Sequence, residues 1–184
     1  MNHFTILLSV AALVGSAAAS LAQTTSPYAG QEQRSIKALS DREISDLTEG
    51  RGLGLAKAAE LNSYPGPLHV LELASVLNLT DTQRAATQSL YAGMRERAQP
   101  LGTKIIDAER DLDRAFVDGT ISTPELRSRL NAIAALLGEL RAVHLEAHLA
   151  QRSVLTPQQV AKYDELRGYH ANVAEPSAHQ RKEH

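Results

Sequence analysis

Residues 79–117 read LTDTQRAATQSLYAGMRERAQPLGTKIIDAERDLDRAFV, and this stretch decides the fold. It opens with Thr80 and, three residues later, Gln83, a capping box in which each side chain can accept a hydrogen bond from the other residue's backbone amide. Apolar or small residues then recur at alternating steps of three and four: Thr87, Leu90, Met94, Ala98, Leu101, Ile105, Ala108, Leu112 and Phe116. The spacing predicts one amphipathic helix from Asp81 to Val117, kinked near Pro100, because the register continues through the proline.

A second long helix follows a turn of about five residues. Thr123-Pro124-Glu125 begins it with a cap, a proline at the first helical position and an acid near the positive end of the helix dipole. Its apolar stripe consists of Leu126, Leu130, Ile133, Leu137, Leu140, His144 and Ala147. The two helices are expected to lie antiparallel, since this buries both stripes against each other. The predicted fold class is all-α, a long antiparallel helical hairpin with shorter flanking helices.

Shorter helices are predicted on both sides of this hairpin. Ser40 and Glu43 form another capping box, which starts a helix at residue 41. The glycines at positions 50, 52 and 54 interrupt that helix, and we expect a hinge there because each glycine costs about 1 kcal/mol relative to alanine in a helix. A proline opens a short helix over about residues 67–77, and a last helix begins at residue 157 and is ended by Gly168.

The beginning of the chain has the pattern of a secretory signal peptide. Residues 4–14 are almost wholly apolar, and Ser20-Leu21-Ala22 is a small-x-small cleavage pattern, with cleavage after Ala22 or alternatively after Ala19. The apolar stretch is shorter than the roughly 20 residues of a lasting membrane helix, so we expect export to the periplasm without stable membrane insertion after cleavage. The predicted organisation is a signal peptide (1–22), a flexible leader (23–39), a helical domain (40–169) and a disordered tail (170–184).

The composition narrows the classes of function. The chain has no cysteine, which excludes disulfides and thiol chemistry. Its net charge of -2 and its interleaved acids and bases give no footprint for nucleic acid. It contains no nucleophile-elbow, zinc-protease or Walker motif, and the glycines at positions 50, 52 and 54 lack the strand and the lysine that phosphate binding requires. We therefore expect a binding protein, not an enzyme.

Two boxes of the form L-T-x-x-Q precede helices in this chain. One copy alone is a good helix start, but two copies in an exported, cysteine-free helical chain resemble the Spy/CpxP family of periplasmic stress proteins, which includes periplasmic heavy-metal sensors. The resemblance covers residues 40–169. It implies a four-helix hairpin arrangement, a homodimer, and binding of unfolded periplasmic proteins without ATP or modulation of an envelope sensor protein. In that reading the box residues are structural: Leu79, Thr80, Gln83, Leu155, Thr156 and Gln159.

The sharpest local feature is the pair His144 and His148. Histidines at i and i+4 project from one helix face and could share zinc, copper, nickel or cobalt, although a hydrogen-bonded histidine pair between helices would leave the same pattern. Two ligands are an incomplete set, and His69 and Glu72 are the candidates to complete it. The metal-sensor relatives use histidines, a glutamate and often a methionine, whereas Met94 is expected to lie far from His148. The scattered tail histidines are interpreted as incidental: His170, His179 and His184.

Overall fold

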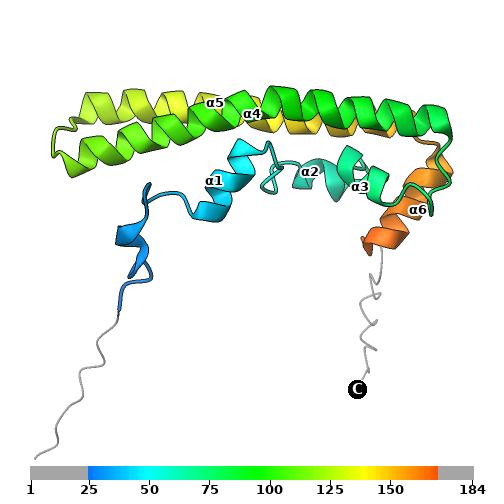
Figure 1. The fold of residues 1–184 in the computed structure, drawn as a ribbon, viewed down its shortest axis with the longest axis horizontal. Coiled ribbons are helices and arrows are strands. Elements are labelled where there is room, and N and C mark those ends of the chain that lie inside the picture. Colours follow the sequence, from blue (N-terminus) through cyan, green and yellow to red (C-terminus); the bar gives the residue numbers. More distant parts are fainter. Residues whose placement is uncertain (1–24, 170–184) are drawn as a thin grey trace, which may run out of the picture. The chain divides into compact units, whose positions relative to one another are not determined.

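The computed structural model describes residues 25–169, so the predicted signal peptide and tail lie outside the described residues. The described residues divide into two units, residues 25–32 and residues 33–169. The described elements are a short 3-10 helix, η1 (Gln31–Gln33), and the helices α1 (Asp41–Thr48), α2 (Lys57–Glu60), α3 (Pro67–Glu72), α4 (Asp81–Val117), α5 (Thr123–Val154) and α6 (Pro157–Arg167) (Figure 1). Residues 25–169 contain no strand, and the predicted all-α class is confirmed.

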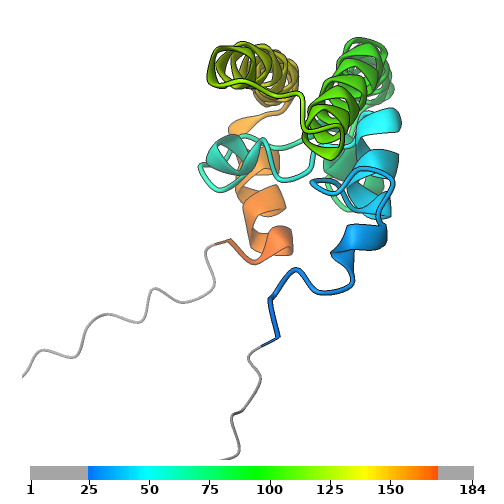
Figure 2. The ribbon, with the colours of Figure 1, turned by 90° about the vertical axis from the view of Figure 1, so that its left-hand side faces the viewer.

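The two long helices pack against each other, with the shorter helices of the second unit on one side of the pair (Figures 1 and 2). Helix α4 is continuous through Pro100, as predicted. The beginning of α4 contacts the end of α5, where the side-chain amide of Gln151 donates to the Thr87 hydroxyl at 3.1 Å. Farther along, Arg97 forms an ion pair with Glu146 at 2.7 Å. No helix among residues 25–169 combines the length and the apolar character needed to cross a membrane.

The buried face of α5 differs in part from the predicted stripe. Leu130 and Leu137 are 46% and 40% exposed, whereas Leu136 and Val143 pack into the core instead. Leu130 and Leu137 lie on one side of the row formed by Ile133 and Leu140, and Leu136 and Val143 lie on the other. Both sides are apolar, so the periodicity of the sequence could not show which side is buried. Other differences are the exposure of Phe116, the burial of Ala115, and a helix cap at Ser122 where the cap was expected at Thr123.

Two hydrophobic clusters lie under the long helices. The first contains Ile36, whose side chain is 1% exposed, together with Leu47, Ile105 and Leu140. Residues 33–39, predicted to be part of a flexible leader, therefore contribute to the packed unit. The second cluster joins the segment around α3 to α6 and contains Val70, Leu77, Leu155, Val160 and Tyr163. Helix α3 itself ends at Glu72, five residues before the predicted end, and a turn with Asn78 in the left-handed region follows it.

The two L-T-x-x-Q boxes meet at one end of the long helices. Thr80 and Thr156 cap α4 and α6 with complete capping boxes. The side-chain Nε2 of Gln83 donates to the side-chain Oε1 of Gln159 at 2.8 Å. Nε2 of Gln159 donates in turn to Oε1 of Gln83 at 3.0 Å. Each amide nitrogen also donates to a backbone carbonyl oxygen, of Val154 and Leu77 respectively. We call these four box residues (Thr80, Gln83, Thr156 and Gln159) the box joint, since they fasten α6 to the start of α4.

Candidate functional site: a histidine pocket

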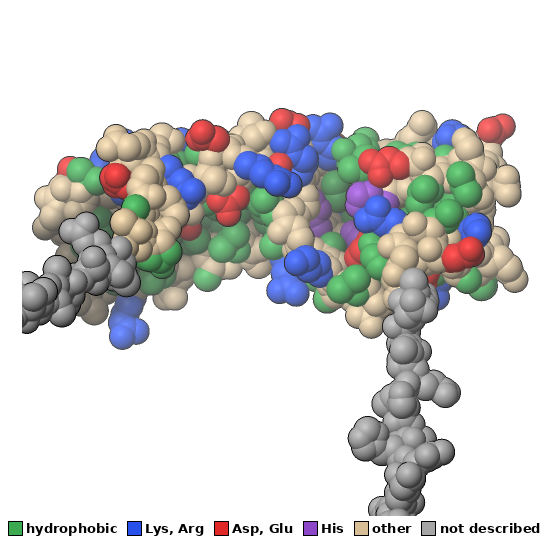
Figure 3. Space-filling view, turned by 90° about the horizontal axis from the view of Figure 1, so that it is seen from below, with side chains coloured by type: hydrophobic (Ala, Val, Ile, Leu, Met, Phe, Trp, Pro, Cys, Tyr) green, Lys and Arg blue, Asp and Glu red, His purple; other side chains and the backbone are tan. Residues whose placement is uncertain are grey.

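His144 and His148 lie on the face of α5 that the shorter segments cover, and their side chains are largely buried (3% and 8% exposed). A pocket of about 310 Å³ opens beside them, and histidine side chains gather at one place on the face seen in Figure 3. We call it the histidine pocket. Its lining includes residues 50–54, residues 66–69, Tyr91 and Met94.

Two glycines face the imidazole rings, and the close packing is at Gly66. At Gly66 a Cβ atom would lie 2.9 Å from Cε1 and 3.1 Å from Nε2 of His148, so a larger residue would displace the ring. At Gly52 a Cβ atom would lie 3.8 Å from Nδ1 of His144, an ordinary contact. The segment Tyr64-Pro65-Gly66-Pro67, which leads into α3, thus supplies the glycine that packs against the ring of His148.

The position of His148 is set through one ring nitrogen. Its Nδ1 lies 2.7 Å from the Tyr64 carbonyl oxygen, which can only accept, so Nδ1 carries the hydrogen and donates. The carboxylate of Glu60 lies 3.6 Å from the same nitrogen. In the neutral ring Nε2 therefore keeps its lone pair. Such an arrangement, with one nitrogen held and the other basic, is typical of histidines that bind metals.

His144 differs from His148 in its hydrogen bonding. Its Nε2 is buried and has no hydrogen-bond partner among residues 25–169. Burial, with a further contribution from the neighbouring His148, lowers the pKa of His144 below its ordinary value. The ring is therefore neutral at pH 7, and its buried Nε2 is a polar atom that no described residue bonds.

Glu60 is a buried carboxylate that sequence reasoning missed. One of its oxygens accepts hydrogen bonds from the hydroxyl groups of Tyr163 and, at 2.8 Å, Tyr169, and Arg167 lies 3.5 Å from it. The other oxygen is buried without a hydrogen-bond partner among the described residues. Burial, and next the bond to Glu60, raise the pKa of Tyr163 well above its usual range. In the sequence, the position of Glu60 is marked only by an acidic residue in the otherwise largely apolar stretch 55–61.

The structure brings together three of the four predicted metal ligands. His69, His144 and His148 line the same pocket, whereas Glu72 does not line it. Glu72 instead lies 2.9 Å from Nδ1 of His69, on an exposed surface. Among residues 25–169 no group of three histidine, cysteine or acidic side chains is already arranged to hold a metal ion.

Met94 also lines the histidine pocket, and the expectation that it lies far from His148 is wrong. The reason is the pairing of the long helices, because Thr87 lies opposite Gln151 and Arg97 lies opposite Glu146. Met94 falls between these two contacts, at the level of the histidines. The position of Met94 along α4 therefore did not indicate its distance from His148 on α5.

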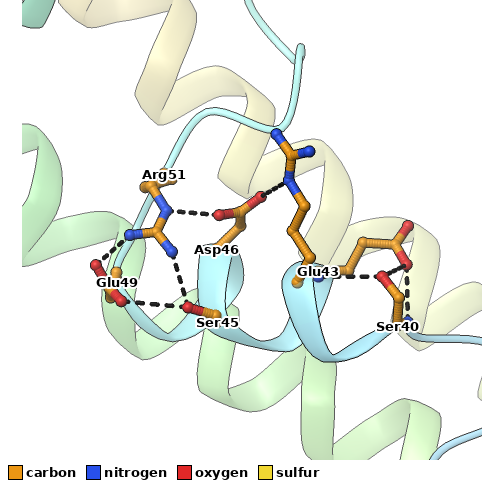
Figure 4. A network of polar contacts seen from close by, with 7 residues as sticks. Ser40, Glu43, Ser45, Asp46, Glu49 and Arg51 are labelled. Carbon is orange, nitrogen blue, oxygen red and sulfur yellow. Dashed lines mark hydrogen bonds and ion pairs between the residues drawn. The ribbon is translucent and has the colours of Figure 1, made fainter. Parts of the chain in front are cut away.

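A polar network stands beside the pocket at the end of α1. The guanidinium group of Arg51 contacts Asp46 at 2.5 Å, Ser45 at 2.8 Å, and Glu49 (Figure 4). The hydrogen bond to Asp46 is the main cause that raises the pKa of Arg51. These contacts hold the chain that leads into the glycines at positions 52 and 54.

Comparison with known proteins identified no relative of this chain. No protein-family model matches the chain, and neither a curated protein nor a solved structure matches it.

Proposed function

We propose that this protein is an exported helical binding protein of the Spy/CpxP type, which acts without ATP on unfolded periplasmic proteins or on an envelope stress sensor. The observation that carries the proposal is the box joint, since the two L-T-x-x-Q boxes bond reciprocally through Gln83 and Gln159. The proposal includes the finer fold, in which α4 and α5 form a long antiparallel hairpin within a four-helix arrangement. It also includes a homodimer and no enzymatic activity.

Exposed apolar side chains on the long helices support client binding. Leu130 and Leu137 lie seven residues apart, so they share one face of α5, and they are 46% and 40% exposed. Phe116 and Val117 at the end of α4 are 57% and 66% exposed. Exposed apolar surface of this kind is suited to contact with apolar segments of other chains.

Light scattering tests the chaperone function. Stoichiometric protein is expected to suppress the aggregation of a chemically denatured client, and a Leu130→Ser, Leu137→Ser variant is expected to suppress it less. Leu149→Ser is the matched control, because Leu149 is an exposed leucine elsewhere on α5. An unchanged scattering curve with the wild-type protein contradicts the proposal.

A second candidate function, metal binding, is favoured by the histidine pocket. His144 Nε2 has no hydrogen-bond partner among residues 25–169, and the bond of His148 through Nδ1 leaves its Nε2 to face a metal beside His69 and Met94. Nitrogen and thioether donors suit zinc, copper, nickel or cobalt. His69 could join through Nε2, because its contact with Glu72 is made by Nδ1. In this second function, His144 and His148 on α5 bind the metal, and His69 on α3 completes the ligand set.

Calorimetry with zinc, copper, nickel and cobalt tests this second function. Binding tighter than about millimolar is expected for at least one metal, and a His144→Ala, His148→Ala variant is expected to lose it. His179→Ala is the control for metal bound by histidines outside the pocket. Binding that survives the double substitution would assign the metal to another part of the chain.

A further inference from the structure

Residues 50–54 form one wall of the histidine pocket, and we call them the glycine segment. Both ends are fixed. Gly50 is buried against α4, where a Cβ atom would lie 3.2 Å from that of Ala98, and Leu55 packs against the first hydrophobic cluster. Between these ends no side chain is buried, since Arg51 and Leu53 are exposed and the other residues are glycines. The segment therefore spans the pocket with little packing of its own.

The backbone of the glycine segment is in an uncommon conformation. Gly50, Leu53 and Gly54 have positive φ values of 67°, 47° and 76°. Leucine adopts this region at a cost, whereas glycine enters and leaves it freely. A strained leucine between two glycines can change conformation without disturbing the helices on either side.

Arg51 is the side chain that holds the glycine segment to α1. Its contacts reach Asp46 and Ser45 in α1 and the capping residue Glu49 (Figure 4). They are solvent-exposed polar contacts, which are individually weak and readily exchanged for water. At Gly52, the next residue, the Cβ position faces the ring of His144, 3.8 Å from Nδ1.

We propose that the glycine segment is a strap that opens and closes the histidine pocket, with Arg51 as its latch. When the latch is released, Gly52 moves off His144 and the ring becomes accessible from solvent. This inference concerns access to the pocket, goes beyond the proposed functions, and holds whether or not the pocket binds a metal.

Chemical modification by diethylpyrocarbonate tests the strap. The reagent acylates neutral imidazole nitrogens, and the assay is run on purified protein at pH 7 with EDTA, so metal affinity does not enter. Cleavage after Arg141 and Arg152 yields one peptide with His144 and His148, and tandem mass spectrometry separates the two sites. His69 lines the same pocket, so N-acetylhistidine added to each reaction serves as the reference.

The variants Arg51→Ala and Gly52→Ala are expected to move the rate at His144 in opposite directions. Loss of the latch raises the rate about two- to fivefold relative to N-acetylhistidine. Alanine at position 52 fits the pocket and restricts the backbone, so it lowers the rate about twofold. Arg42→Ala is the matched control, because Arg42 lies 3.8 Å from the same Asp46 but outside the segment, and no change is expected.

Three results would overturn the strap. The first is an unchanged rate at His144 in Arg51→Ala, and the second is an equal rise in Arg42→Ala. The third is a rise in Arg51→Ala with a wild-type rate in Gly52→Ala, which would place the opening elsewhere. Circular dichroism of each variant confirms that the compared proteins are equally folded.

Discussion

The box joint and the histidine pocket are both polar regions between helices, but they treat their polar groups in opposite ways. In the joint, each glutamine amide nitrogen donates twice and each amide oxygen accepts from its partner and from a capped backbone amide. In the pocket, His144 Nε2 and one oxygen of Glu60 have no hydrogen-bond partner among the described residues. Satisfied groups stabilise a fold, whereas buried unsatisfied groups cost stability and need another reason to be there. We infer that the joint serves structure and the pocket serves binding.

The largest effect is expected from Gln83→Glu in the joint. Glutamate preserves the capping box but removes both donated hydrogen bonds and faces the Gln159 and Val154 oxygens with a carboxylate. The free energy of unfolding in urea should fall by about 2–3 kcal/mol. Gln158→Glu, at an exposed neighbouring position, should change it by less than about 0.5 kcal/mol. Equal effects of the two substitutions would remove the special role of the joint.

Gly66→Ala should have the next largest effect, in the pocket. The added methyl group meets the His148 ring at 2.9 Å, and the overpacking should cost about 1–3 kcal/mol. Gly138→Ala, in open space on α5, should instead stabilise by up to about 1 kcal/mol.

A second substitution separates overpacking from backbone strain. His148→Ala makes room for the methyl group, so the double variant should be more stable than the sum of the two single changes predicts. Strict additivity would show that Gly66 is needed for its backbone and not for the ring of His148.

A smaller effect is expected from pH. The pKa of His144 is lower in the folded protein than its ordinary value of 6.5, so below that value the unfolded chain binds more protons. Stability should therefore fall as the pH drops through 6.5 toward the folded pKa. Urea unfolding at pH 7.5 and 5.5 in EDTA should show a smaller loss for His144→Leu than for the wild-type protein. The same loss in both proteins would mean that another group titrates.

Local sequence patterns predicted the helix starts well. The capping boxes at Ser40, Thr80 and Thr156 lie where the sequence placed them, since capping depends on residues within one turn. Contacts between distant segments were not predictable. Gln83 and Gln159 are 76 residues apart, and nothing in either box indicates that the two amides bond to each other.

The candidate site was predictable only in part. The i, i+4 spacing identified His144 and His148, and the pocket includes His69 as well. The position of Met94 was predicted wrongly, and the roles of Glu60, Gly52 and Gly66 were not predicted, because they depend on how the helices pack. Glu72 was included for its spacing to His69, and it contacts that residue outside the pocket.

We infer that His144 is buried in the pocket because it binds a ligand, and that it does not stabilise the folded protein. The most direct test is the free energy of unfolding of His144→Leu in urea at pH 7.5 with EDTA. Leucine fills similar space and removes the unpartnered ring nitrogen, so the variant should be as stable as the wild-type protein or more stable by up to about 1 kcal/mol. A loss of more than about 2 kcal/mol would show that His144 is a structural residue, and would contradict the account.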